Sequence, residues 1–244
     1  MSTTTKFFTS GSPSAWEKAL GLYGDVMKLK ASNIKKPGGK KELLELDKWY
    51  QEDLPELIQG RKPKYITHEE IAKLMKWKLT RGKFRPRLNE MVKENKPELV
   101  ESASTKAFKS LPNLEKAIKE MTVLRAVGPA TASAILAAGA PEHAPFMADE
   151  SMLPIPGLAP LKYTPVQYAQ YSAEVKACIK RLQKEDSSAE WTPHKVEIAL
   201  WTHYMASKLQ PSLLAQLDDG EKRKASDDGD QKGAKRSKRG DNAR

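Results

Sequence analysis

Thirteen residues decide how this chain is interpreted: Leu124-Arg125-Ala126-Val127-Gly128-Pro129-Ala130-Thr131-Ala132-Ser133-Ala134-Ile135-Leu136. We expect an apolar helix before them, a helix of small residues after the proline, and a tight turn at Val127-Gly128. Gly128 suits a positive φ or the close approach of another backbone, because glycine has no Cβ. Pro129 fits the first position of the second helix. The N–H groups at that helix start point outward and favour binding of a phosphate.

Around this stretch, the sequence predicts an all-α fold over residues 12–217. Apolar residues recur at helical spacing and no strand-like alternation is evident. Helix starts are predicted where capping residues stand, at Thr67, Asn113, Thr164 and Thr192. Residues 1–11 are rich in Ser and Thr, with only Phe7 and Phe8 as a bulky pair, so we expect a disordered N-terminus there.

Composition limits the classes of function. The chain has 244 residues, a net charge of +11 and a single cysteine, Cys178. One cysteine cannot build a disulfide framework, a cysteine-ligated zinc site or an iron–sulfur cluster, and the histidines lack metal-ligand spacing, so no metal and no cofactor is expected. No apolar run reaches the roughly 18–20 residues of a membrane span, so no membrane is expected. The positive charge favours a polyanionic partner such as nucleic acid.

The segment 218–244 carries no aromatic or branched aliphatic residue, so we expect a disordered tail. Its cations form two clusters separated by ten residues. These clusters are Lys222, Arg223 and Lys224, followed by Lys235, Arg236, Lys238 and Arg239. The spacing matches a bipartite nuclear import signal, which predicts an import receptor as partner and the nucleus as location. The alternative is a generic solubilising tail that binds nucleic acid non-specifically.

The segment from Arg61 to Arg87 holds ten Lys/Arg against two glutamates. On the helix inside it, Lys73, Trp77 and Arg81 fall roughly opposite the apolar face. An exposed tryptophan between two cations suits base stacking and phosphate contact. The alternative is that Trp77 packs on a second surface while the cations form a solvated rim.

Two further features of this segment point toward a ligand. Lys78 falls on the inward face of the helix, where it either reaches out to solvent at the helix end or lines a cleft. After the helix comes a loop with a glycine and cations at Lys83, Arg85 and Arg87. An extended basic loop of this kind suits contact with backbone phosphates, without reading sequence.

An acidic pair follows the small-residue helix, beyond a loop rich in Ala, Gly and Pro. The pair is Asp149-Glu150, at the end of Phe146-Met147-Ala148-Asp149-Glu150. Taken together, residues 113–150 resemble the helix–hairpin–helix motif of base-excision DNA glycosylases, with Asp149 where that superfamily has its catalytic Asp. The residues that match the hairpin in register are Leu124, Val127, Gly128, Thr131 and Ala132.

The resemblance implies an activity and a set of DNA contacts. Asp149 would stabilise an oxocarbenium-like sugar and orient water during hydrolysis of an N-glycosidic bond. The hairpin contacts to DNA would come from Val127, Gly128, Ala130 and Thr131. Ala130 stands where bifunctional members carry a Schiff-base lysine, so the resemblance implies a monofunctional hydrolase without an iron–sulfur cluster. Ala126 departs from the pattern, which has the first hairpin glycine there, and Glu150 replaces a small hydroxyl residue.

Other candidates lie around the carboxylate. Only one of Asp149 and Glu150 is expected to face a cleft, because adjacent side chains on an extended chain diverge. Lys78 could pair with either carboxylate, and His143 could touch the substrate from the loop. The competing interpretation of the motif is a core helix pair with a turn, with Asp149 as a helix cap. Apart from the motif, we expect the histidines to be ordinary core or surface residues and Trp201 to be a core residue.

Three hypotheses therefore stand. They are a nuclear DNA glycosylase-like enzyme, a non-catalytic nucleic-acid-binding module that keeps the hairpin for phosphate contact, and a helical protein-interaction domain with a nuclear tail. The first two take duplex DNA, damaged or intact, as the partner. We expect the protein to be a monomer in each case.

Overall fold

The computed structural model describes residues 2–215 and residue 217. Within those residues the chain forms helices and loops without a strand, which confirms the all-α prediction. The first half contains α1 (Thr3–Ser10), α2 (Pro13–Gly21), α3 (Tyr23–Ser32), α4 (Gly39–Lys48), the π-helix η1 (Trp49–Asp53), α5 (Leu54–Gln59), α6 (His68–Arg81) and α7 (Leu88–Lys93). The second half contains α8 (Pro97–Lys109), α9 (Leu114–Met121), α10 (Pro129–Gly139), α11 (Asp149–Met152), α12 (Pro165–Glu185), α13 (Pro193–Leu209) and the 3₁₀ helix η2 (Pro211–Leu214).

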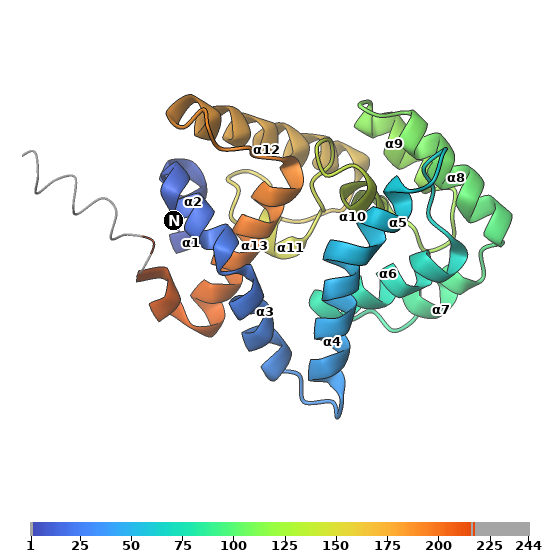
Figure 1. Ribbon diagram of the computed structural model, residues 1–244, viewed down its shortest axis with the longest axis horizontal. Coiled ribbons are helices and arrows are strands. Elements are labelled where there is room, and N and C mark those ends of the chain that lie inside the picture. Colours follow the sequence, from blue (N-terminus) through green and yellow to red (C-terminus); the bar gives the residue numbers. More distant parts are fainter. Residues whose placement is uncertain (1, 216, 218–244) are drawn as a thin grey trace, which may run out of the picture.

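The helices gather in two groups that share a core (Figure 1). Helix α13 packs on α1, α2, α3, α11 and α12, so the beginning and the end of the described chain form one group. Helices α4 to α10 form the other, in which α6 contacts α4, α7, α8 and α10. The two groups meet where α3 packs on α4 and where α10 touches α12.

The predicted helix starts are confirmed. Thr67, Asn113, Thr164 and Thr192 each cap a helix with a side-chain oxygen that accepts from a backbone N–H three residues on. At Thr67 the capping box is complete, because the Glu70 carboxylate also accepts from the Thr67 N–H. Such caps satisfy backbone donors that the helix itself leaves free.

The prediction of a disordered N-terminus over residues 1–11 is wrong. The helix α1 occupies most of this segment, and its Phe7 and Phe8 are buried. The Phe7 ring stacks on Trp16 at 4.4 Å and on His203 at 4.2 Å between centroids. Two phenylalanines are too few to show a periodic pattern, yet they bury enough apolar surface to hold a short helix against α13.

No helix among residues 2–215 is long and apolar enough to cross a membrane. The predicted nuclear import clusters, from Lys222 to Arg239, lie outside the described residues.

Candidate functional site

A cavity of about 450 Å³ opens where the two helix groups meet. Three segments that are far apart in sequence form its walls: the end of α6 with the loop after it, the segment Leu124–Thr131 and the segment Phe146–Glu150. We call the first loop, residues 82–87, the basic loop, and Leu124–Thr131 the hairpin segment. The lining residues are Lys78, Arg81, Gly82, Lys83, Arg85, Leu88, Leu124, Ala126, Val127, Gly128, Pro129, Ala130, Thr131, Phe146, Met147, Ala148, Asp149, Glu150 and Tyr163.

The structure thus brings most of the predicted site residues to one place. Asp149 shares the pocket with Lys78, with the hairpin segment and with two cations of the basic loop, Lys83 and Arg85. Glu150 lines it as well, so the expectation that only one of the two carboxylates faces a cleft is wrong. The reason is local, because both residues begin the short helix α11 instead of lying on an extended chain.

The segment before Asp149 is fixed by contacts with two helices. The Met147 N–H donates to the Ser133 hydroxyl on α10 at 3.0 Å. From α12, the Tyr171 hydroxyl donates to the Phe146 carbonyl at 3.2 Å, and the Tyr168 hydroxyl donates to the Pro145 carbonyl at 3.1 Å. These bonds satisfy buried backbone groups and hold the approach to Asp149 in one conformation.

Tyr163 is a site residue that sequence analysis missed. Its hydroxyl donates to both carboxylate oxygens of Asp149, at 2.8 and 2.9 Å. Burial and the neighbouring Asp149 carboxylate raise the pKa of Tyr163 to about 12. Its backbone takes a left-handed φ of 52°, and its N–H donates to the Gln167 side chain at 3.1 Å. Tyr163 belongs to an irregular loop, where no periodicity marks a residue as inward-facing.

Lys78 lies half-buried in the pocket wall, in the last turn of α6. Burial and the positive charge of Arg85 together lower its pKa to about 8, although the negative charge of Asp149 opposes both effects. Of the two positions that the sequence left open, solvent or cleft, the structure shows the cleft. Arg85 also lies 6.0 Å from the ring centroid of Tyr163, so the basic loop reaches toward the carboxylate.

Trp77 is not available for base stacking, so that prediction is wrong. Its side chain is fully buried, stacks on Tyr50 at 3.4 Å between centroids, and donates to the Asp47 carboxylate at 2.9 Å. A helical-wheel projection assigns one buried face, whereas α6 is covered by α4 on one side and by α8 and α10 on others. The alternative of a second packing surface is confirmed.

Arg81 is likewise a structural residue, and its predicted role in phosphate contact is wrong. It touches the pocket wall, but its exposed fraction is only 1%. Both terminal guanidinium nitrogens donate to the Glu197 carboxylate at 3.1 Å, and its guanidinium lies 4.4 Å from the Trp201 ring. A buried charge needs such partners, since an unpaired one would destabilise the fold strongly. Trp201 is fully buried, which confirms it as a core residue.

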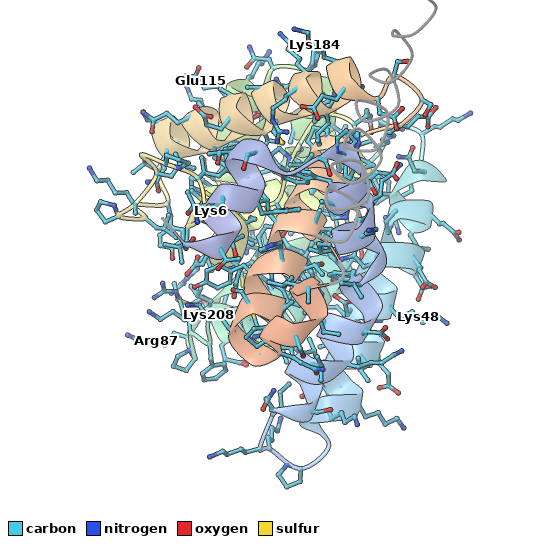
Figure 2. The ribbon with its side chains drawn as sticks, turned by 90° about the vertical axis from the view of Figure 1, so that its left-hand side faces the viewer. Lys6, Lys48, Arg87, Glu115, Lys184 and Lys208 are labelled. Atoms are coloured by element: carbon cyan, nitrogen blue, oxygen red, sulfur yellow. The ribbon has the colours of Figure 1, made fainter. Side chains whose placement is uncertain are left out.

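Three other predicted residues lie away from the pocket lining. The Lys73 ammonium lies 4.4 Å from the Trp49 ring on the far side of α6. His143 pairs with its neighbour Glu142 at 3.5 Å. Arg87 ends the basic loop and points outward at the edge of the molecule (Figure 2).

The hairpin segment has a strained residue at its turn. Ala126 takes a left-handed φ of 64°, a region that L-residues with a Cβ rarely adopt. Asn95 secures the turn, because its side chain accepts from the Arg125 N–H at 2.8 Å and donates to the Arg125 carbonyl at 3.0 Å. Pro129 is the first residue of α10, as predicted.

Gly128 does not take the positive φ that its glycine allows. Its φ is −91° and its ψ is −177°, an extended conformation open to any residue. A Cβ built at Gly128 would meet nothing within 4 Å. The position that a Cβ would occupy is therefore unfilled, at a glycine that lines the pocket directly before α10.

Comparisons with models of protein families, with curated proteins and with solved structures give no significant match. No group of three or more His, Cys, Asp or Glu that could hold a metal ion occurs in the described part of the chain.

Proposed function

We propose that this protein binds DNA in the nucleus and hydrolyses the N-glycosidic bond of a base that has left the helix stack, with Asp149 as the catalytic carboxylate. The observation that carries the proposal is the pocket itself. It gathers a carboxylate, apolar walls, a hairpin segment and a basic loop from separate parts of the chain. Its volume of about 450 Å³ lies within the usual range of small-ligand pockets.

The walls suit a flipped base. Phe146, Met147 and Leu88 supply apolar surface, which grips a base by stacking and burial. Asp149 stands among them with its oxygens held by Tyr163, so the carboxylate is oriented before a ligand arrives. A negative charge fixed beside the sugar stabilises the positive charge that develops as the glycosidic bond breaks.

The rim suits the DNA backbone and the bases beside the flipped one. The side chains of Lys83 and Arg85 are exposed and reach the pocket from the basic loop. Between them Phe84 is 72% exposed, the most exposed large hydrophobic side chain among the described residues. An aromatic ring flanked by cations is the arrangement that stacks on bases while the cations neutralise phosphates.

The decisive test is base release from duplex oligonucleotides that each carry one damaged or mismatched base. Asp149→Asn should lower the single-turnover rate by about a hundredfold or more, a usual contribution of one positioned catalytic group, while DNA affinity stays within a few-fold. Glu150→Gln is the matched control, because Glu150 lines the same pocket without the Tyr163 hydrogen bonds. Its effect should be much smaller.

Two other outcomes of this experiment would favour the two other hypotheses. Salt-dependent DNA binding without release of any base would indicate a non-catalytic DNA-binding module. Absence of both would leave a helical protein-interaction domain.

A further inference from the structure

We infer that Lys78 is an amine nucleophile, which forms an imine with the C1′ aldehyde of an abasic deoxyribose and so cleaves the DNA strand beside it. The inference deepens the proposed function and rests on it, since an abasic sugar is the product of base release. The amine in question comes from α6, whereas the hairpin position that resembles that of bifunctional glycosylases is Ala130.

The position of Lys78 carries the inference. Its side chain lines the same pocket as Asp149, close enough for their charges to interact, and it is half-buried. The walls beside it include Phe146 and Leu88, so an aldehyde bound there would be partly shielded from water. A carboxylate in the same pocket as the amine can supply the base that imine chemistry also needs.

The protonation state of Lys78 suits a nucleophile. Burial, with Arg85 nearby, lowers the pKa of Lys78 to about 8. At pH 7 about a tenth of such amines are neutral, against fewer than about one in a thousand for an unperturbed lysine. Lys109 is exposed on α8 and lies outside the pocket lining, which makes it an internal comparison.

The reaction balances without an oxidant or a reductant. The neutral amine of Lys78 adds to C1′ of the open-chain aldehyde, and the carbonyl oxygen leaves as water once the adduct has taken up one proton, so a protonated imine forms. Asp149 then removes a proton from C2′, the electron pair forms the C2′–C3′ double bond, and the C3′–O bond breaks with loss of the 3′ phosphate. Water hydrolyses the unsaturated imine, which returns the amine and releases an aldehyde.

The test uses the full chain and a duplex with a preformed abasic site, so it does not depend on base release. Sodium borohydride adds hydride to the imine and leaves a stable secondary amine between protein and DNA. We expect a cross-linked product and strand cleavage with the unchanged protein, and peptide mapping of the cross-link to Lys78. Lys78→Arg keeps the positive charge but cannot form the imine, and should lower both products at least tenfold.

Two further variants keep the result interpretable. Lys109→Met, at an exposed lysine of α8 outside the pocket lining, should cross-link at the normal rate. Lys78→Met separates loss of the amine from crowding by a guanidinium. Thermal unfolding shows whether each variant is folded. The inference is overturned by the absence of a cross-link, by mapping to another amine, or by undiminished cross-linking in folded Lys78→Arg. Base release without a cross-link would overturn the role of Lys78 alone, and a cross-link without base release would overturn only hydrolysis.

Discussion

The Tyr163 hydroxyl donates to both oxygens of the Asp149 carboxylate, so a single side chain from an irregular loop orients the group that begins α11. Gln167 in turn accepts from the N–H groups of Lys162 and Tyr163, at 2.6 and 3.1 Å. The Gln167 amide also donates to the Leu158 carbonyl at 2.7 Å. The orientation of the carboxylate is therefore fixed by a chain of contacts that begins in the first turn of α12.

Removing the Tyr163 hydroxyl should impair the proposed base release. A hydrogen bond to a charged group contributes about 1.5–3 kcal/mol, and its loss lets the carboxylate rotate. Tyr163→Phe should lower the single-turnover rate about tenfold while DNA affinity changes little. Tyr204→Phe is the control, because Tyr204 is half-buried on α13 and lies outside the pocket lining. Equal effects of the two variants would contradict a positioning role.

The strained turn predicts a stabilising substitution. Ala126 adopts a φ of 64°, where an L-residue with a Cβ is disfavoured by about 1–2 kcal/mol and glycine is not. Ala126→Gly should raise the free energy of unfolding by up to about 1 kcal/mol, after the extra unfolded-state entropy of glycine is subtracted. Denaturant unfolding measures it. Ala130→Gly, in the first turn of α10, should instead destabilise the protein.

Because the position of a Cβ at Gly128 is unfilled, a substitution there tests DNA affinity separately from stability. Because its backbone is extended and a Cβ would touch nothing, Gly128→Ala should leave the free energy of unfolding unchanged or raise it slightly. If the DNA backbone approaches this glycine, the same methyl group should weaken duplex affinity about tenfold. Fluorescence anisotropy measures the affinity. Unchanged affinity would show that DNA does not come close to this turn.

The exposed ring in the basic loop predicts a contribution to DNA affinity. A base stacked on an aromatic side chain contributes about 1–3 kcal/mol, so Phe84→Ala should weaken binding by about tenfold or more. The slope of affinity against salt should stay the same, because no charge is removed. Leu57→Ala is the control, since Leu57 is also exposed but lies on α5. A change in the salt slope would indicate that the loop itself had rearranged.

Two histidines, His203 buried and His194 half-buried, predict loss of stability in acid. Burial lowers the pKa of His194 and of His203 to about 4 from an ordinary value of 6.5. Below pH 6.5 the unfolded chain takes up protons that the folded chain refuses, so stability falls as the pH drops toward 4. At pH 5 each histidine should lower the free energy of unfolding by about 2 kcal/mol relative to pH 8.

The test compares His203→Gln with the unchanged protein by denaturant unfolding from pH 8 to 5. The variant should lose about half of the histidine contribution to this pH dependence. His143 lies half-exposed on a loop, so His143→Gln should retain the full histidine contribution to the pH dependence. Identical pH dependence in both variants would contradict the assignment to buried histidine.

Much of the fold was predictable because capping residues act locally. Thr67 and Asn113 accept from N–H groups three residues on, so the sequence alone shows where their helices begin. The burial of Trp77 could not be predicted from the sequence, because it depends on η1 placing Tyr50 against the indole ring. A single helix does not reveal how many of its faces have neighbours.

The site was predictable in part for the same reason. The hairpin segment and Asp149 belong to one short stretch with characteristic spacing, so they could be assigned together. The positive charge of the basic loop suggested that it binds DNA, but the sequence did not show that this loop lies beside Asp149. Tyr163 and Asn95 act through contacts with residues that are 14 and 30 positions away in the sequence. A local sequence pattern does not predict such contacts. Arg81 has its partner Glu197 still further along the chain, 116 residues away.

The packing of α1 on α13 also has a consequence for folding during synthesis. The Thr4 hydroxyl and the His203 ring are hydrogen-bonded at 3.0 Å across 199 residues of sequence. The helix α1 therefore leaves the ribosome without its packing partner, which it gains only after α13 has been made. Contacts of such long range slow folding and leave the apolar side of α1 exposed meanwhile, so this helix needs protection from aggregation until α13 is in place.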